Sequence, residues 1–188
     1  NTFDGSLVKG QVSYADGPPG GLDDSASFTK LTLNVNRLQN LVEGRLLLYG
    51  ALRYQRALAN LDTSEQFRVG GPDAVRAFAP GEGAGDSGQV LTVELRLLPP
   101  ESLIGRIARE IVASAFFDTG SVTFRHDPSQ RPSTFVNSAS YSGVGIGFSW
   151  EHPGQYALRA SLAKPVRGSP TSDQPRSIRL YAQLTRFF

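Results

Sequence analysis

Residues 89–98 of the chain read Gln-Val-Leu-Thr-Val-Glu-Leu-Arg-Leu-Leu. Apolar residues alternate here with polar or charged ones, as in a β-strand that has one apolar and one polar face: Leu91, Val93, Leu95 and Leu97 against Thr92, Glu94 and Arg96. Seven further segments alternate in the same way over roughly the 9–11 positions that a tilted strand needs to cross a bilayer. They cover residues 4–15, 28–40, 43–58, 110–123, 140–150, 155–166 and 177–188.

The connections between these segments decide between two all-β folds. A soluble sandwich and a membrane barrel produce the same alternation, because either fold has one apolar and one polar strand face. The connections alternate in length: those near 16–27, 59–88, 124–139 and 167–176 are long, 41–42 and 151–154 are short, and 99–109 is intermediate with room for a helical turn. Outer-membrane barrels have long extracellular loops and short periplasmic turns. The sequence therefore predicts a single all-β domain over 1–188, an antiparallel transmembrane β-barrel with eight strands present.

Composition excludes several other classes of protein. No run of 18 apolar residues and no signal peptide is found, so no transmembrane helix is expected. Cysteine is absent, which excludes disulfides, thiolate metal sites and a cysteine nucleophile. Methionine is absent too, so we expect that Asn1 is not an initiator and that the chain begins inside a longer precursor. The net charge of +2 is spread along the strands, which argues against nucleic-acid binding.

No motif predicts catalysis, a metal or a cofactor. The glycine-rich run 81–88 could suggest a phosphate loop, but it lacks the Gly-Lys-Ser/Thr ending and contains Glu82 and Asp86. The histidines, His126 and His152, lie in the sequence without metal-ligand spacing. We therefore expect that the protein is not an enzyme.

The 59–88 connection is too rich in buried-type residues for a solvated loop. Phe67, Val69, Val75 and Phe78 lie within it, which indicates a folded hairpin that packs on something.

Two strands carry unusual residues on the face expected to line the lumen. Asp118 shares its strand face with Phe116 and Gly120, and a carboxylate away from water needs a cationic partner. Three glycines share one face of another strand, where they clear a groove or allow the barrel to curve: Gly143, Gly145 and Gly147.

Together these motifs resemble the transporters of two-partner secretion, of the haemolysin-activator type, within the superfamily that includes the barrel-assembly protein BamA. The resemblance covers nearly the whole chain and rests on ordered motifs: Gly70-Gly71-Pro72, then Val75-Arg76-Ala77-Phe78, Gly85-Asp86-x-Gly88, Glu94-Leu95-Arg96, and Phe116-x-Asp118-x-Gly120. Ala77 stands where the family usually has glycine. The terminal Phe188 looks like the signal that outer-membrane barrels present to their assembly machinery.

The resemblance implies the second half of a sixteen-stranded barrel in the bacterial outer membrane, preceded by periplasmic POTRA domains. Its implied function is passage of an unfolded adhesin or haemolysin through the barrel, and we expect a monomer at full length. We also expect Arg76, at the loop tip, to meet Asp118, with the three strand glycines making room for the loop backbone and Phe78 nearby. The alternatives are an assembly barrel of the same superfamily and an autonomous eight-stranded barrel or sandwich that acts as a binding module.

Overall fold

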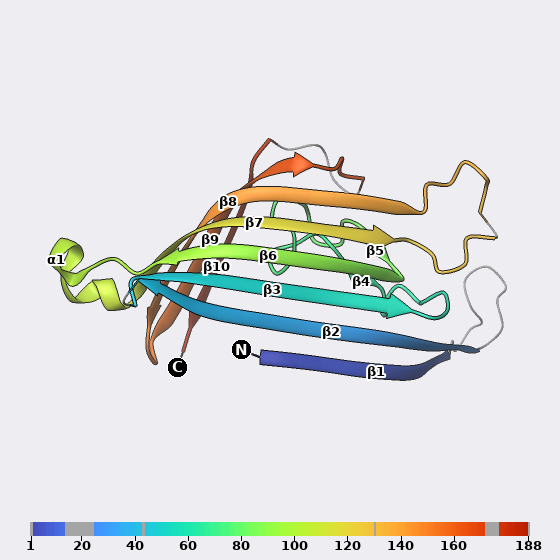
Figure 1. Cartoon of the computed structure of the whole chain (residues 1–188), viewed down its shortest axis with the longest axis horizontal. Helices are drawn as coiled ribbons and strands as arrows, with labels where there is room; N and C mark the ends of the chain where they lie inside the picture. Colours follow the sequence, from blue (N-terminus) through green and yellow to red (C-terminus); the bar gives the residue numbers. More distant parts are fainter. Residues whose placement is uncertain (1, 14–24, 43, 130, 172–176, 188) are drawn as a thin grey trace.

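Eight long strands form one antiparallel sheet in a computed structural model that describes residues 2–13, 25–42, 44–129, 131–171 and 177–187 (Figure 1). Each predicted segment overlaps one of these strands, so the prediction of eight strands is confirmed. In spatial order they are β1 (Thr2–Ser13), β2 (Ser25–Val42), β3 (Leu46–Ala57), β6 (Ser87–Leu97), β7 (Ile111–Thr123), β8 (Ser138–His152), β9 (Tyr156–Arg167) and β10 (Arg179–Arg186).

The sheet is curved but does not close on itself (Figure 1). In the described part of the chain β1 pairs only with β2, and β10 pairs only with β9. Open edges leave rows of backbone N–H and C=O groups without partners, which a closed barrel does not have. The geometry is that of a partial barrel, and it disfavours the autonomous eight-stranded barrel. The count of sixteen strands stays a prediction.

The two faces of the sheet have the polarity that the alternation predicts. On β6, Leu91 and Val93 are 41% and 40% exposed, whereas Glu94 is only 9% exposed. A sandwich would show the opposite, with these apolar side chains buried between two sheets. The exposed apolar face continues across the neighbouring strands, with Leu31, Leu48, Leu95, Phe117, Val144, Ile146, Leu162, Leu180 and Leu184. This face is the expected lipid-facing surface.

The 99–109 connection contains the helical turn that its length suggested. A short helix α1 (Glu101–Ile104) leads into a 3-10 turn η1 (Gly105–Arg109) at one end of the strands (Figure 1). Gly105 has a φ of 69°, a value that favours glycine, at the junction of the two turns. Among the described residues, no helix is long and apolar enough to cross a membrane.

The long connection between β3 and β6 folds back against the concave face of the sheet. This inner loop (residues 58–86) contains the two-residue strands β4 (Phe67–Arg68) and β5 (Ala84–Gly85), which pair with each other within the curve of the sheet (Figure 1). Its apolar side chains build the main core together with residues of the strands: Phe67, Val69, Ala74, Val75, Ala77 and Phe78 from the loop, and Val90, Phe116, Val122, Tyr141 and Ala163 from the sheet. The 59–88 segment therefore packs on the concave face of the sheet, as the folded hairpin that its composition indicated.

Candidate functional site

The tip of the inner loop is a compact turn held by main-chain hydrogen bonds. Val75 N donates to Val69 O at 2.9 Å, and Gly70 N donates to Glu82 O at 2.9 Å. A side chain at Gly70 would meet Cβ of Glu82 at 2.7 Å, and Gly71 has a φ of 131°, which disfavours any residue with a Cβ. The two glycines of the Gly70-Gly71-Pro72 motif therefore let the chain turn tightly before Arg76.

Arg76 engages Asp118 through both arms of its guanidinium fork. Nε lies 2.9 Å from Oδ2 and Nη2 lies 3.0 Å from Oδ1, and the main-chain N of Arg76 also donates to Oδ2 at 3.2 Å. The Asp118 side chain is completely buried, and Thr92 Oγ1 donates to its Oδ1 at 2.9 Å. The expected contact between loop tip and strand is present, in the bidentate geometry that favours arginine over lysine.

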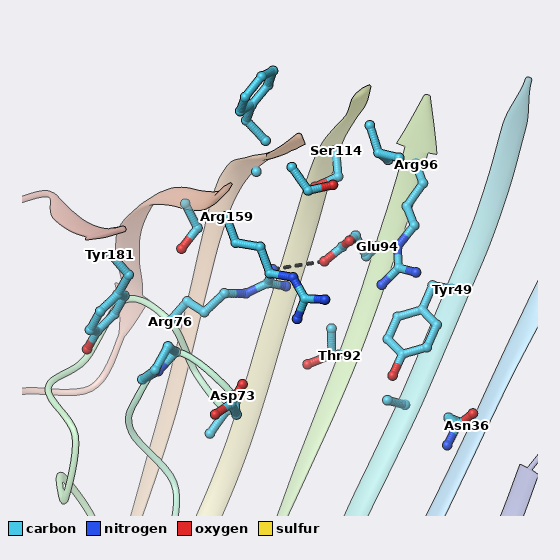
Figure 2. Close-up of a pocket in the computed structure, with 18 of the residues that line it drawn as sticks. Asn36, Tyr49, Asp73, Arg76, Thr92, Glu94, Arg96, Ser114, Arg159 and Tyr181 are labelled. Atoms are coloured by element: carbon cyan, nitrogen blue, oxygen red, sulfur yellow. Dashed lines mark hydrogen bonds and ion pairs between the residues drawn. The ribbon is translucent and has the colours of Figure 1, made fainter. Parts of the chain in front are cut away.

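A second carboxylate, Glu94, completes the site, and its role there was not predicted from the sequence. Arg76 Nη1 lies 2.8 Å from Oε2 of Glu94, whose Oε1 accepts from Arg96 Nε at 2.9 Å. Figure 2 shows the Arg76 side chain reaching across to Glu94, with Arg96 and Tyr49 on the same side of the sheet. Two cations and two anions thus form a neutral network, which lowers the cost of holding these charges away from water. The one indication of this role in the sequence is that Glu94 lies on the same polar strand face as Thr92.

Phe116 supports the arginine from below. Its ring centroid lies 3.2 Å from Cζ of Arg76, a cation–π arrangement, and the ring is 5% exposed. Phe116 therefore joins the site as a platform for the arginine of the loop tip.

The three glycines of β8 serve different neighbours. A Cβ at Gly143 would overlap the side chain of Ala77, so this glycine does make room for the loop. A Cβ at Gly145 would instead overlap Leu162 O of β9 and the Phe116 ring, and one at Gly147 would meet Ser114 Oγ at 2.5 Å. The prediction that all three receive the loop backbone is wrong for Gly145 and Gly147, because atoms of the adjacent strands β7 and β9 occupy the space beside them.

The segment after Arg76 is fixed by aromatic side chains. The Phe78 ring is 1% exposed and meets the Tyr141 ring edge to face, with centroids 4.9 Å apart. The Tyr181 hydroxyl of β10 donates to Phe78 O at 2.7 Å. No local pattern in the sequence connects β8 or β10 to the loop, so neither tyrosine could be assigned to the site from sequence. Ala77, in the place of the usual glycine, is 3% exposed and fits against Gly143.

The remaining motif glycines let the base of the loop lie against the strands. A Cβ at Gly88 would meet the Phe67 ring at 2.5 Å, and one at Gly120 would meet Cγ1 of Val69 at 2.7 Å. A Cβ at Gly85 would meet Thr123 O at 2.6 Å. These close approaches explain the glycines of Gly85-Asp86-x-Gly88 and Phe116-x-Asp118-x-Gly120. Phe188 lies outside the described residues, so its role as an assembly signal stays a prediction.

A cavity of about 870 Å³, with polar and apolar side chains in its wall, lies beside the loop tip. The tip, the sheet and the carboxylate network contribute polar side chains to its wall, among them Asn34, Tyr49, Arg53, Asp73, Arg76, Thr92, Glu94, Arg96, Arg159, Tyr181 and Gln183 (Figure 2). The polar residues Asn34, Arg159 and Gln183 of β2, β9 and β10 all line this cavity. The arginines supply hydrogen-bond donors and the carboxylates supply acceptors, so this wall can hydrogen-bond to an extended polypeptide or to the water around it.

A curved antiparallel sheet with an apolar outer face, a polar inner face and a loop latched inside defines a segment of an outer-membrane β-barrel. The chain belongs to the Omp85 superfamily, whose domain model matches residues 2–188. This confirms the motif-based assignment to the superfamily that contains the two-partner secretion transporters, and it places the chain in the outer membrane, as predicted.

Two kinds of known protein are similar to this chain. The heme/hemopexin transporter protein HuxB from two strains of Haemophilus influenzae is 29% identical over 113 residues, which cover 60% of this chain and 19% of that protein. The structure of CdiB from Acinetobacter baumannii matches with a TM-score of 0.56 and 19% identity over 85% of this chain and 27% of that one. At this identity the likeness to CdiB shows the fold. The chain thus spans about a fifth of the length of the HuxB proteins.

Proposed function

We propose that this barrel segment works in a two-partner secretion transporter, which passes an unfolded exoprotein of the adhesin or haemolysin type across the outer membrane. The observation that carries the proposal is the inner loop held in the lumen by Arg76, between Asp118 and Glu94 and beside the cavity. The similarity to a protein named as a transporter supports the same function.

The geometry suggests how the loop regulates passage. An unfolded chain carries a donor and an acceptor on nearly every residue, so its path through the barrel must offer polar partners or water. The cavity wall offers polar partners, but the docked loop occupies the space beside it. When Arg76 withdraws, Glu94 keeps its bond to Arg96 and Asp118 keeps its bond to Thr92. The barrel wall therefore retains partners for its carboxylates when the tip is displaced, which makes displacement reversible.

An assembly barrel of the same superfamily is the alternative function. The lead-in Gln66-Phe67-x-x-Gly70-Gly71-Pro72 and the Gly85-Asp86-x-Gly88 motif favour the secretion branch. The two functions differ in what fails when the latch, the contact of Arg76 with Asp118 and Glu94, is broken. Export of one exoprotein fails in the first case, and insertion of many other barrels fails in the second.

The test compares Arg76→Ala with Arg68→Ala in the intact protein, produced together with its exoprotein. Arg68 is an exposed arginine of the same inner loop that lies outside the cavity wall and outside the contacts of Arg76 with Asp118 and Glu94, so it is a matched control. We expect the Arg76 variant to reach the outer membrane at normal level and to export less exoprotein, while the control exports normally. Normal export by Arg76→Ala would contradict the proposal, and a general loss of other outer-membrane barrels would favour the assembly function.

A further inference from the structure

Asp86 is a fully buried carboxylate at the base of the inner loop. It lies at the end of the loop, directly before β6 begins at Ser87, and its exposed fraction is 0%. The latch through Arg76 and Asp118 does not involve it. A carboxylate this deeply buried is stabilised only if strong donors surround it.

Its donors are three amides from two separate parts of the chain. Leu61 N and Gln66 Nε2 each donate to Oδ1 at 3.2 Å, and His126 N donates to Oδ2 at 2.8 Å. Leu61 and Gln66 belong to the incoming limb of the inner loop, whereas His126 lies in the loop between β7 and β8. One side chain thus joins both limbs of the inner loop to a neighbouring loop at the far end of the sheet from α1 (Figure 1).

Main-chain contacts strengthen the same junction. Asp86 N donates to Phe124 O at 3.2 Å, and Gln55 Nε2 of β3 donates to the main-chain oxygens of both Asp86 and Glu65, each at 3.1 Å. Gln55 is 5% exposed, so these bonds are shielded from water.

A reciprocal pair of hydrogen bonds adds a further link between the two loops. Asn60 Nδ2 donates to Asp127 O at 3.1 Å, and Asp127 N donates to Asn60 Oδ1 at 2.8 Å. The base of the inner loop therefore moves together with the first residues of the β7–β8 loop.

Tip and base differ in how readily they can be released. The carboxylates that hold the tip keep Thr92 and Arg96 as partners when Arg76 leaves. Asp86 has no such remaining partner among its described donors, because these are the amides that belong to the junction itself. Moving the base away would therefore leave its carboxylate buried without them.

We propose that Asp86 is a positioning residue: it fixes the base of the inner loop to the β7–β8 loop and gives the tip a stationary pivot when Arg76 leaves Asp118. The proposal rests on the proposed function only in assuming that the tip moves during export. It predicts that base and tip loosen independently. Loss of Asp86 frees the limbs near Leu61 and Gln66, whereas loss of Arg76 frees the tip alone.

The chain has no cysteine, so pairs of spin labels can be introduced without background from it. One pair, Ser64→Cys with Ser140→Cys, reports the base against β8, and a second pair, Asp73→Cys with Ser140→Cys, reports the tip; all three positions are exposed. Distance distributions are measured in the intact protein in lipid vesicles. The variants are Asp86→Asn, which keeps the shape of the side chain but turns one acceptor into a donor, and Arg76→Ala.

We expect Asp86→Asn to broaden and shift the base distribution while the tip distribution stays narrow, and Arg76→Ala to do the reverse. Asp73→Asn, measured with the base pair, is the matched control because it removes an exposed carboxylate of the same loop. If Asp86→Asn fails to assemble, Gln66→Ala removes one donor and should broaden the base distribution to a smaller extent.

An unchanged base distribution in Asp86→Asn, or in Gln66→Ala where that variant takes its place, would overturn the proposal. So would an Arg76→Ala variant that loosens base and tip together. The distances are independent of export. If Arg76→Ala loses export but Asp86→Asn leaves the base distribution unchanged, the proposed function stands and the pivot is refuted. If base and tip loosen independently but Arg76→Ala exports normally, the pivot stands and the proposed function is refuted.

Discussion

The substitution Arg76→Ala tests the latch most directly. It removes two side-chain bonds to Asp118, one to Glu94 and the stacking on Phe116. Removing one member of a buried ion pair costs about 3–5 kcal/mol, because the partner charge stays buried. Here both carboxylates keep another donor, Thr92 for Asp118 and Arg96 for Glu94, so the lower end of that range applies. We expect the docked state of the loop to weaken by about 3 kcal/mol, or about a hundredfold in its equilibrium constant.

Hydrogen exchange of the loop amides measures this change. The N–H groups of Val75 and Arg76 are bonded within the docked tip, to Val69 O and to Asp118 Oδ2. Their exchange should accelerate by about a hundredfold in the variant, while the ladder amides of β6 and β7 remain protected. In Arg76→Lys the loop amides should exchange at a rate between those of the parent protein and of Arg76→Ala, because an ammonium group keeps the charge but cannot form the bidentate contact.

A double-mutant cycle with Asp118→Ala separates a latch from two unrelated defects. Each single substitution leaves a charge without its main partner, whereas the double variant removes both charges. We therefore expect the double variant to lose no more docking, and no more export, than the worse single one. Additive losses, or loop amides in Arg76→Ala that exchange as slowly as in the parent protein, would refute the latch.

Four other experiments probe the wall and the ends of the barrel. Val93→Arg on the apolar face should cost about 2–4 kcal/mol of barrel stability, measured by unfolding in vesicles, and Gln183→Arg in the cavity far less. Gly143→Ala should undock the tip by overlapping Ala77, at a cost of about 1–3 kcal/mol, and faster loop exchange would show it. Deleting Phe188 should lower the yield of assembled barrel, seen as loss of its compact form on electrophoresis. The pKa of Glu110 is lowered by the indole N–H of Trp150 and by His152, so its stabilising effect is present above its ordinary value of 4.5 and is lost as pH falls through the lowered pKa. Fluorescence of the single Trp150 should report that transition below pH 4.5, and Glu110→Gln should abolish it.

The strands and their faces were available from sequence because both depend on local rules. Strand side chains alternate between two faces, so the spacing of Leu91, Val93 and Glu94 already determines which residues turn outward. The same rule placed Asp118 inside. The 59–88 segment was identified as a folded loop because its composition conflicts with solvent exposure. The pairing of Arg76 with Asp118 came from the family resemblance, since nothing in the spacing of two residues 42 positions apart specifies a contact.

Tertiary structure alone decided which residues share the latch and which glycines serve it. Glu94 and Phe116 join Arg76 because β6 and β7 pair in a register that sets them opposite each other, and register depends on the whole sheet. The same cause assigns Gly145 to the Phe116 ring and only Gly143 to the loop. The role of Asp86 depends on amides brought together from distant parts of the chain, and main-chain donors carry no side-chain signature that a sequence could display.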